Sequence, residues 1–397
     1  MPSLASTRSE SAPRPRPGVD PVLWALLAAL LVRQAVQLGM VLANQPLGCD
    51  LLPLWTAGSI AFRSPQDLYN FDAITRLQAW VVPHPTGPQP WIYAPSALLL
   101  FAPFGKLPFG LFYPLWTGVT GALLGWAAAT RLHRDRWVCL ALLGLGSACF
   151  MSILIGQVTL LIGALALCGL GLLDRRPILA GVLLGAAAMI KPTAFLLLPV
   201  ALLAVGSWRT LIAAAGTAIA AWALSSALFG WGLWLDWLHA LPAFDRLVRS
   251  EPTLWRGVIN FTWLAHLAGA SDGLVLGVRA ALAAAGAALV WVVFRRTRDV
   301  ATRVIVMVGV SLMITPYAMF YDAAILAAPA VILMSADARR LGRGLACFLL
   351  VELAASPPVA PLGLLALVLM AAAPSLRGLA TPVRQGPAVN GREAAAS

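Results

Sequence analysis

Apolar stretches of close to 20 residues recur along the chain from Leu23 almost to its C-terminus, separated by short polar segments. Runs of this length with few charges are typical of membrane-crossing helices. We therefore expect an all-α, polytopic transmembrane helical bundle of about twelve spans, and the short apolar stretch 91–105 leaves thirteen as the alternative. The predicted spans are roughly 22–45, 109–130, 137–155, 157–173, 178–190, 192–206, 209–230, 274–294, 301–316, 322–336, 342–355 and 359–373.

The segments outside these spans are of two kinds. Residues 1–20 and 376–397 are predicted as disordered tails around a transmembrane domain at 21–375, because the first is rich in Ser, Pro and Arg without apolar periodicity. Two long outer loops, about 46–93 and 231–272, are expected on one side of the membrane. The first contains amphipathic helical patterns at 51–62 and 72–82. The second is dense in tryptophan, which is typical of helices at the membrane interface.

Composition supports the membrane assignment and gives an orientation. Only 11% of the residues are charged, against about 25% in a soluble domain. The net charge of +12 comes from arginines in small clusters between apolar runs. The positive-inside rule produces that spacing, so no nucleic-acid partner is expected. Counting the clusters puts both termini in the cytoplasm and both long loops outside, in a multi-pass protein of the inner (plasma) membrane.

Several classes of chemistry have no signature in the chain. The four histidines and five cysteines lack the spacing of metal ligands, so no metal site is expected. No P-loop, dinucleotide fingerprint or nucleophile elbow is present, and no cofactor is predicted.

The scarce polar residues near apolar runs are the candidates for function, because ionisable groups are costly in a bilayer. Asp50 directly follows the first span and is either a helix cap or a partly desolvated general base. Lys191, one of two lysines, precedes a proline inside an apolar stretch and either snorkels or binds phosphate. Gln157 and Asp322 occupy two further connections that the topology places on the same outer side.

The chain resembles bacterial glycosyltransferase family 87, integral-membrane enzymes of the GT-C fold that use polyprenyl-phosphate sugars. The resemblance spans roughly residues 20–335 and rests on an ordered set of short pieces. These are Asp50, Trp55-Thr56-Ala57-Gly58, Asp67-Leu68-Tyr69, Trp91-Ile92-Tyr93-Ala94-Pro95, Phe101-Ala102-Pro103, Leu107-Pro108, Gly156-Gln157, Gly181 to Lys191-Pro192, and Pro316 to Asp322.

The resemblance implies an inverting sugar transfer on the non-cytoplasmic face, with Asp50 as the catalytic base. Its partners would be a polyprenyl-phosphate sugar donor, a glycolipid or glycan acceptor of the cell envelope, and membrane lipids. The best-known members transfer mannose. Ala94 and Tyr321-Asp322 depart from the family pattern, so a hexose is predicted and mannose is favoured.

The chemistry assigns further residues to two groups. Cations that would stabilise the leaving phosphate are Lys191, Arg63 and Arg256, with Arg279 as a further helper. Residues expected to bind the sugars are Trp55, Tyr69, Tyr93, Gln157, Tyr321 and Asp322. A polytopic transporter or lipid flippase is the first alternative function, and a non-catalytic membrane scaffold is the second.

Overall fold

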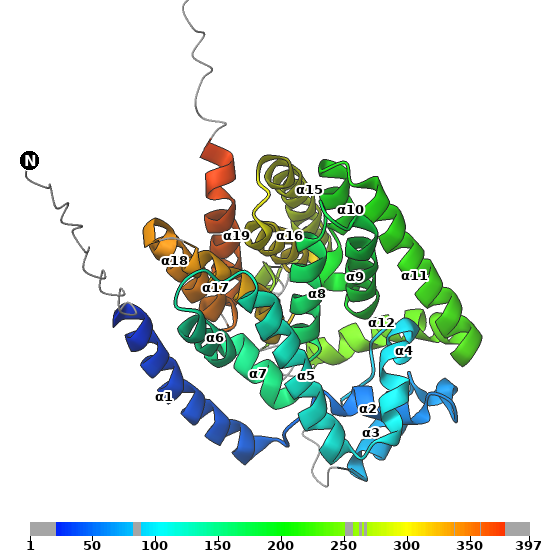
Figure 1. Ribbon diagram of the computed structural model, residues 1–397. Helices are drawn as coiled ribbons and strands as arrows, with labels where there is room; N and C mark the ends of the chain where they lie inside the picture. Colours follow the sequence, from blue (N-terminus) through cyan, green and yellow to red (C-terminus); the bar gives the residue numbers. More distant parts are fainter. Residues whose placement is uncertain are drawn as a thin grey trace, which may run out of the picture.

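The computed structural model describes residues 21–81, 89–250, 257–261, 264–265, 268–336, 338–357 and 359–377, and for 338–340 the backbone alone. The predicted tail at 1–20 lies outside this range, as does the predicted tail at 376–397 except for Leu376, which ends α19, and Arg377. The described part is helical throughout and contains no β-strand, apart from a single antiparallel bridge between Val258 and Met319 (Figure 1). The prediction of an all-α fold is confirmed.

The helices follow the apolar runs closely. Their bounds are α1 Pro21–Asn44, α2 Leu52–Ile60, η1 Pro65–Asp67, α3 Phe71–Ala79, η2 Pro95–Ala97, α4 Leu98–Phe101, η3 Ala102–Lys106, α5 Phe109–Ala129, α6 Arg136–Leu145, α7 Ser147–Ile155, α8 Thr159–Gly171, α9 Pro177–Ile190, η4 Pro192–Phe195, α10 Leu198–Ala204, α11 Trp208–Phe229, α12 Gly232–Ser250, α15 Asp272–Arg296, α16 Val300–Ile314, η5 Phe320–Ala323, α17 Ala324–Ser335, α18 Ala338–Ala354 and α19 Ala360–Leu376.

Local chemistry sets several of these boundaries. The side chain of Ser271 caps α15 by accepting a hydrogen bond from the N–H of Leu274 at 3.4 Å, and Arg295 and Arg296 occupy its last turn, where cations interact well with the helix dipole. Asp299 caps α16 through the N–H of Thr302 at 2.9 Å. Proline ends α9, because it disfavours helical geometry at Lys191.

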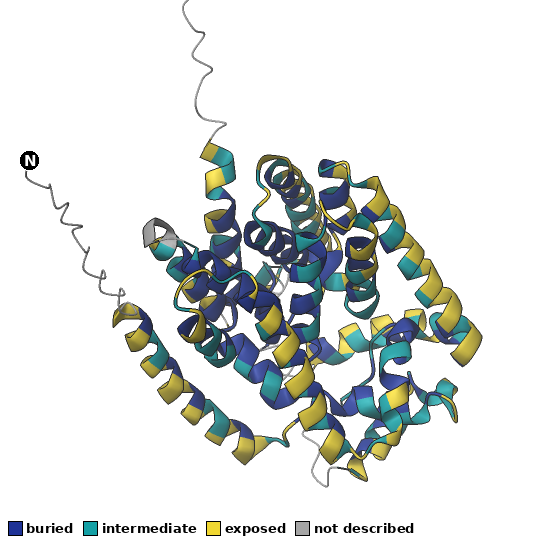
Figure 2. Cartoon of the chain, viewed as in Figure 1, coloured by how far each residue is buried: buried dark blue, intermediate teal, exposed yellow. Residues whose placement is uncertain are grey.

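The bundle has a buried centre and an apolar outside. Every residue of α17 and every residue of α16 except Val300 is buried, and both helices pack against α8. By contrast, α1, α11 and α15 expose apolar side chains along most of their length (Figure 2). Leucines and tryptophans on an exposed surface of this extent indicate contact with lipid rather than water.

Some of the twelve predicted spans are confirmed as candidate membrane-crossing helices by their length and composition. Within the described residues, α1, α11 and α15 are each long and apolar enough to span a bilayer, and α6 with α7 forms a fourth candidate bent by 58°. Most of the other predicted spans correspond to shorter apolar helices, and α5, with 21 residues, is not among the four candidates, so the count of twelve stays a prediction. The segment 91–105 folds as η2, α4 and η3.

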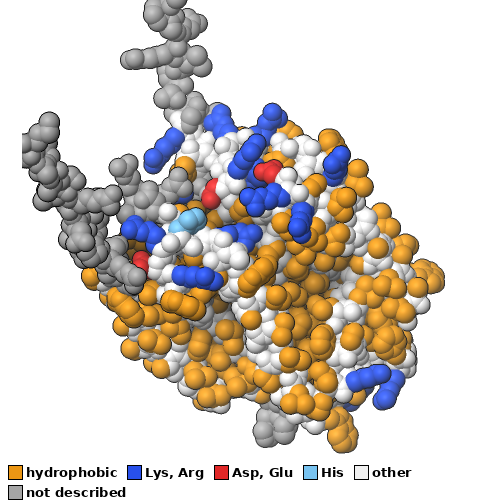
Figure 3. All heavy atoms as spheres, in the orientation of Figure 1, with side chains coloured by type: hydrophobic (Ala, Val, Ile, Leu, Met, Phe, Trp, Pro, Cys, Tyr) orange, Lys and Arg blue, Asp and Glu red, His pale blue; other side chains and the backbone are white. Residues whose placement is uncertain are grey.

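The two ends of the bundle differ in charge. Figure 3 shows most of the visible Lys and Arg side chains gathered over one end, above a largely hydrophobic flank. We call it the arginine-rich end; it includes the first residue of α6, the last turn of α15 and the residue after α19. Helices α9 and α15 connect this end with the opposite one, where Lys191 follows α9 and Asp272 begins α15.

The helices expected in the outer loops form, with one correction. In α3 and α12 apolar positions gather on one face, as predicted. The prediction of an amphipathic helix at 51–62 is wrong: six of the nine residues of α2 are buried and none is exposed, so the helix has no solvent-facing side. The reason is that η3 and α3 pack around α2 and cover the face that the pattern left to solvent.

Candidate active site

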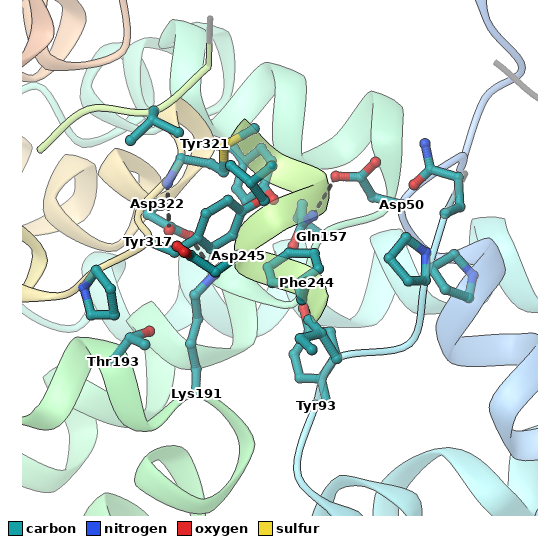
Figure 4. Close-up of a pocket in the computed structure, with 18 of the residues that line it drawn as sticks. Asp50, Tyr93, Gln157, Lys191, Thr193, Phe244, Asp245, Tyr317, Tyr321 and Asp322 are labelled. Atoms are coloured by element: carbon teal, nitrogen blue, oxygen red, sulfur yellow. Dashed lines mark hydrogen bonds and ion pairs between the residues drawn. The ribbon is translucent and has the colours of Figure 1, made fainter. Parts of the chain in front are cut away.

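A cavity of about 740 Å³ opens at the end of the bundle opposite the arginine-rich end. Parts of the chain that are distant in sequence surround it, among them the α1–α2 connection, residues 89–94, the end of α7 with Gln157, the α9–η4 break, α12, the first turns of α15 and the α16–α17 connection. The sequence-predicted residues Asp50, Tyr93, Gln157, Lys191, Tyr321 and Asp322 all line it (Figure 4).

The backbone around Asp50 is held by the C-terminal end of α7. The N–H groups of Asp50 and Leu51 both donate to the carbonyl oxygen of Ile155, at 2.9 and 3.1 Å, and the N–H of Gly48 donates to Leu154 at 2.8 Å. These bonds use the last carbonyls of α7, which have no partner within the helix. The position of the carboxylate is therefore tied to that of α7.

Gln157 orients the Asp50 side chain. Its Nε2 donates to Oδ2 of Asp50 at 2.5 Å, and the thiol of Cys49 lies 3.6 Å from Oδ1. Gln157 reaches this place because Gly156 ends α7 with φ of +79°, and a Cβ at Gly156 would lie 2.6 Å from the Cβ of Leu51. Only glycine tolerates both the conformation and the close approach.

The electrostatic setting of Asp50 suits a proton acceptor. Burial raises the pKa of its carboxyl above the ordinary value, because the charged form loses hydration. The hydrogen bonds from Gln157 and Cys49 and the charge of Lys191 act in the opposite direction, while the charge of Asp322 adds to the increase. Among the described residues, no ion pair to Asp50 is formed.

Lys191 and Asp322 form a buried ion pair on another part of the wall (Figure 4). The second carboxylate oxygen of Asp322 accepts the N–H of Met319 at 3.0 Å, and Nζ of Lys191 lies 5.4 Å from the centre of the Tyr321 ring. The charge of Lys191 is therefore compensated within the protein, which the sequence pattern did not indicate.

Two arginines also line the cavity, from α12 and from the first turns of α15. Arg249 pairs with Asp245 at 2.9 Å and lies 3.7 Å from Asp272. Nε of Arg279 is buried and has no hydrogen-bond partner among the described residues. Arg279 was predicted as a helper and Arg249 was missed. The sequence pattern that could have indicated Arg249 is its spacing of four residues from Asp245 and eight from Leu241. This spacing puts the three residues on one face of α12, and that face lines the cavity.

Aromatic side chains supply much of the remaining wall. Phe244 and Tyr317 pack edge to face with ring centres 5.1 Å apart, and Trp237 donates from Nε1 to the carbonyl of Ile92 at 3.0 Å. Tyr93 and Tyr321 complete this surface. Flat aromatic faces beside carboxylate and amide groups form the kind of surface on which sugar rings bind.

Comparison with known proteins identifies the family. The profile of glycosyltransferase family 87 matches residues 91–316, more than half of the chain. The chain belongs to this family. No curated protein and no solved structure gives a significant match. The matched residues include Tyr93, Gln157 and Lys191, whereas Tyr321 and Asp322 follow shortly after the matched range and Asp50 lies well before it.

The family membership makes the protein a membrane-embedded glycosyltransferase. It confirms the resemblance read from the sequence and favours the enzyme over the transporter, flippase and scaffold readings. The cavity is accordingly the candidate active site of this family 87 protein.

Three predicted site residues of this glycosyltransferase lie elsewhere, and a fourth is not described. Trp55 donates from Nε1 to the carbonyl of Leu107 at 2.7 Å and packs edge to face on Phe109. Tyr69 donates to the carbonyl of Tyr93 at 2.7 Å and so supports the wall from behind. Arg63 is exposed and does not line the cavity. Arg256 lies outside the described residues.

Proposed function

We propose that the protein transfers a hexose, with mannose favoured, from a polyprenyl-phosphate donor to a lipid-linked or cell-envelope glycan acceptor. The observation that carries the proposal is the Asp50 carboxylate, which faces the cavity, is oriented by Gln157 and is free of any ion pair among the described residues. A carboxylate in that state is suited to take a proton from an acceptor hydroxyl.

The proposed step is a single displacement with inversion. The acceptor oxygen attacks the anomeric carbon while its proton passes to Asp50, and a new carbon–oxygen bond forms. The bond between the anomeric carbon and the phosphate oxygen breaks on the opposite face, and polyprenyl phosphate leaves with both electrons. Because phosphate is a good leaving group, the site needs a base and cations but no nucleotide-binding fold.

Arg279, with Arg249 beside it, is our first choice for holding the donor phosphate. The unpartnered Nε of Arg279 leaves hydrogen-bonding capacity that an anionic ligand can use, and guanidinium groups match phosphate geometry. Lys191, the expected first ligand, is already paired with Asp322 and contributes less net charge. Arg63 was predicted to bind the donor phosphate, but it lies away from the cavity and its position does not support that role. The same role for Arg256 stays a prediction.

The aromatic wall and the Lys191–Asp322 pair are proposed to bind the sugars. Tyr93, Tyr317 and Tyr321 offer flat faces for stacking, and an ammonium–carboxylate pair can donate to and accept from neighbouring hydroxyls of one ring. We propose that Gln157 acts mainly on Asp50, rather than directly on the sugar.

For the membrane arrangement, we propose that the cavity opens to the periplasm or exterior of the inner membrane and that both termini are cytoplasmic. The collection of arginines at the opposite end supports this orientation. The GT-C assignment and the twelve-span topology belong to the same proposal.

The test is a transfer assay with the purified protein in proteoliposomes. Polyprenyl-phosphate mannose, glucose and galactose, each radiolabelled in the sugar, are offered with an extract of cell-envelope lipids as acceptor. We expect labelled glycolipid from one donor, with inverted anomeric configuration by NMR of the product. Movement of intact donor across the bilayer without glycolipid formation would instead support the flippase.

A further inference from the structure

The predicted span 137–155 is broken at Gly146 into α6 and α7, which meet at 58°. Such a break leaves the last carbonyls of one helix and the first N–H groups of the next without partners in their own helices. In the apolar interior of a membrane protein these groups need other partners. Side chains from two distant helices supply them here.

Gln34 of α1 and Glu352 of α18 hold the two sides of the break. Nε2 of Gln34 donates to the carbonyl of Leu145 at 2.6 Å. The N–H of Ser147 donates to both carboxylate oxygens of Glu352, at 2.9 and 3.1 Å. The hydroxyl of Ser147 donates to one of them at 2.5 Å. Glu352 therefore caps the N-terminus of α7, where a negative charge is favourable.

The capping carboxylate is also paired and enclosed. Glu352 is 8% exposed, and Arg33 of α1 donates to it from Nη1 at 2.9 Å. A second nitrogen of Arg33 reaches the hydroxyl of Ser356 at 3.3 Å. A Cβ at Gly146 would lie only 3.1 Å from Oε1 of Glu352, so the break leaves little space beside the carboxylate.

The other end of α7 holds the proposed base. The Ile155 carbonyl accepts the N–H groups of Asp50 and Leu51, and Gln157 follows α7 after the single residue Gly156. With nine residues, α7 is a rod of about 13 Å, too short to absorb a displacement by bending. A shift at Ser147 is therefore transmitted to Gln157 and to the backbone of Asp50.

We propose that Glu352 is a positioning residue of the transferase: it anchors the N-terminus of α7 and so holds Asp50 and Gln157 in register with the bound substrates. This rests on the proposed role of Asp50 as the base. It assigns a use to a buried carboxylate at the opposite end of α7 from Asp50, and the length of α7 puts those ends about 13 Å apart.

Glu352→Ala is the main test, measured in proteoliposomes with radiolabelled polyprenyl-phosphate mannose and cell-envelope lipid extract. We expect kcat to fall roughly 10- to 100-fold, because small misplacements of catalytic groups have effects of that size, while KM for the donor changes less than about twofold. Glu352→Gln keeps an acceptor for the Ser147 N–H and is expected to recover most of the rate. Asn70→Ala, which removes the cap of α3 away from the cavity, is the matched control.

A double-mutant cycle with Gln157→Ala separates positioning from general loss of stability. If Glu352 acts through α7, Glu352→Ala costs much less in the Gln157→Ala background than in the wild type. Full additivity in folded protein, or an unchanged kcat in Glu352→Ala, would overturn the proposal. Glu352→Asp, which keeps the charge but withdraws the carboxylate from the Ser147 N–H by one methylene, serves if Glu352→Ala does not fold, and an unchanged kcat there counts equally against the proposal.

Failure of this proposal and failure of the proposed function give different results. If Asp50→Asn is as active as the wild type, Asp50 is not the base, whatever Glu352 does. If Asp50→Asn is inactive and Glu352→Ala is normal, only the positioning role is wrong.

Discussion

Two of the carboxylates that line the cavity, Asp322 and Asp50, are in opposite chemical states. Asp322 is bonded to the ammonium of Lys191 and to the N–H of Met319, so both of its oxygens are engaged by donors. Asp50 is held by an amide, with a weakly donating thiol nearby, and forms no ion pair among the described residues. The comparison indicates different roles for the two residues. Asp322 stabilises the structure and is proposed to bind the sugars, while Asp50 keeps the capacity to accept a proton.

Breaking the Lys191–Asp322 pair is expected to have the largest effect on stability. Lys191→Met leaves a buried carboxylate without its partner and should lower the free energy of unfolding by about 3–5 kcal/mol. The double variant Lys191→Met/Asp322→Asn should regain much of that loss without regaining activity. Thermal unfolding in detergent, compared across the three proteins, checks this. Equal stability of the single and double variants would contradict it.

Arg279→Ala is expected to lower kcat/KM for the donor about 100-fold, since one charged donor to a leaving phosphate commonly contributes that much. Arg279→Lys keeps the charge and should recover part of the loss, because a point charge lacks the planar guanidinium geometry. Arg63→Ala, at an exposed position away from the cavity, is the control and should leave the rate unchanged. A larger loss in Arg63→Ala than in Arg279→Ala would reverse the assignment.

Gln157→Leu sharpens the comparison by removing the hydrogen bond that favours the charged form of Asp50. Burial already raises the pKa of Asp50, and loss of the Gln157 bond should raise that pKa further. A base works only when deprotonated, so activity is present above the pKa and disappears as the pH falls through it. The acid limb of kcat/KM should therefore move to higher pH in Gln157→Leu, so that kcat/KM at any pH on that limb is lower than in the wild type. An unshifted acid limb would show that Gln157 does not act on Asp50.

Trp55→Phe should have the smallest effect. It removes the hydrogen bond to the Leu107 carbonyl and should lower the free energy of unfolding by about 1 kcal/mol, with kcat and KM unchanged. Unfolding curves and steady-state kinetics of the same preparation test this. A change of KM with normal stability would bring Trp55 back among the sugar-binding residues.

The order of helices was largely predictable, because apolar runs in a membrane protein map directly onto helices. The predicted segment 109–130 corresponds to Phe109–Ala129, and 209–230 to Trp208–Phe229. The break at Gly146 was not predicted, since hydrophobicity continues across it. Arg33 and Glu352 were also missed, although charges inside the predicted spans 22–45 and 342–355 carried the same signal as Lys191.

For the candidate site, the sequence predicted which connections between helices come together, but it did not predict how their side chains pair. Asp50, Gln157, Lys191 and Asp322 were each found from polar residues beside apolar runs, and all four line the cavity. Their pairing depends on side-chain geometry across elements more than 100 residues apart, which no local pattern encodes. Aromatic residues were the least predictable: Trp55 and Tyr69 have the right chemistry for sugars, but their polar groups bond to backbone carbonyls outside the cavity.

The most direct measurement of the central claim is kcat of Asp50→Asn in proteoliposomes with radiolabelled polyprenyl-phosphate mannose, or whichever sugar donor proves active. The amide keeps the size of the carboxylate and cannot take the proton. Loss of a general base predicts a fall in kcat of roughly 10²- to 10⁴-fold, with donor KM and thermal unfolding close to those of the wild type. A folded Asp50→Asn protein that transfers sugar at the wild-type rate would contradict the account.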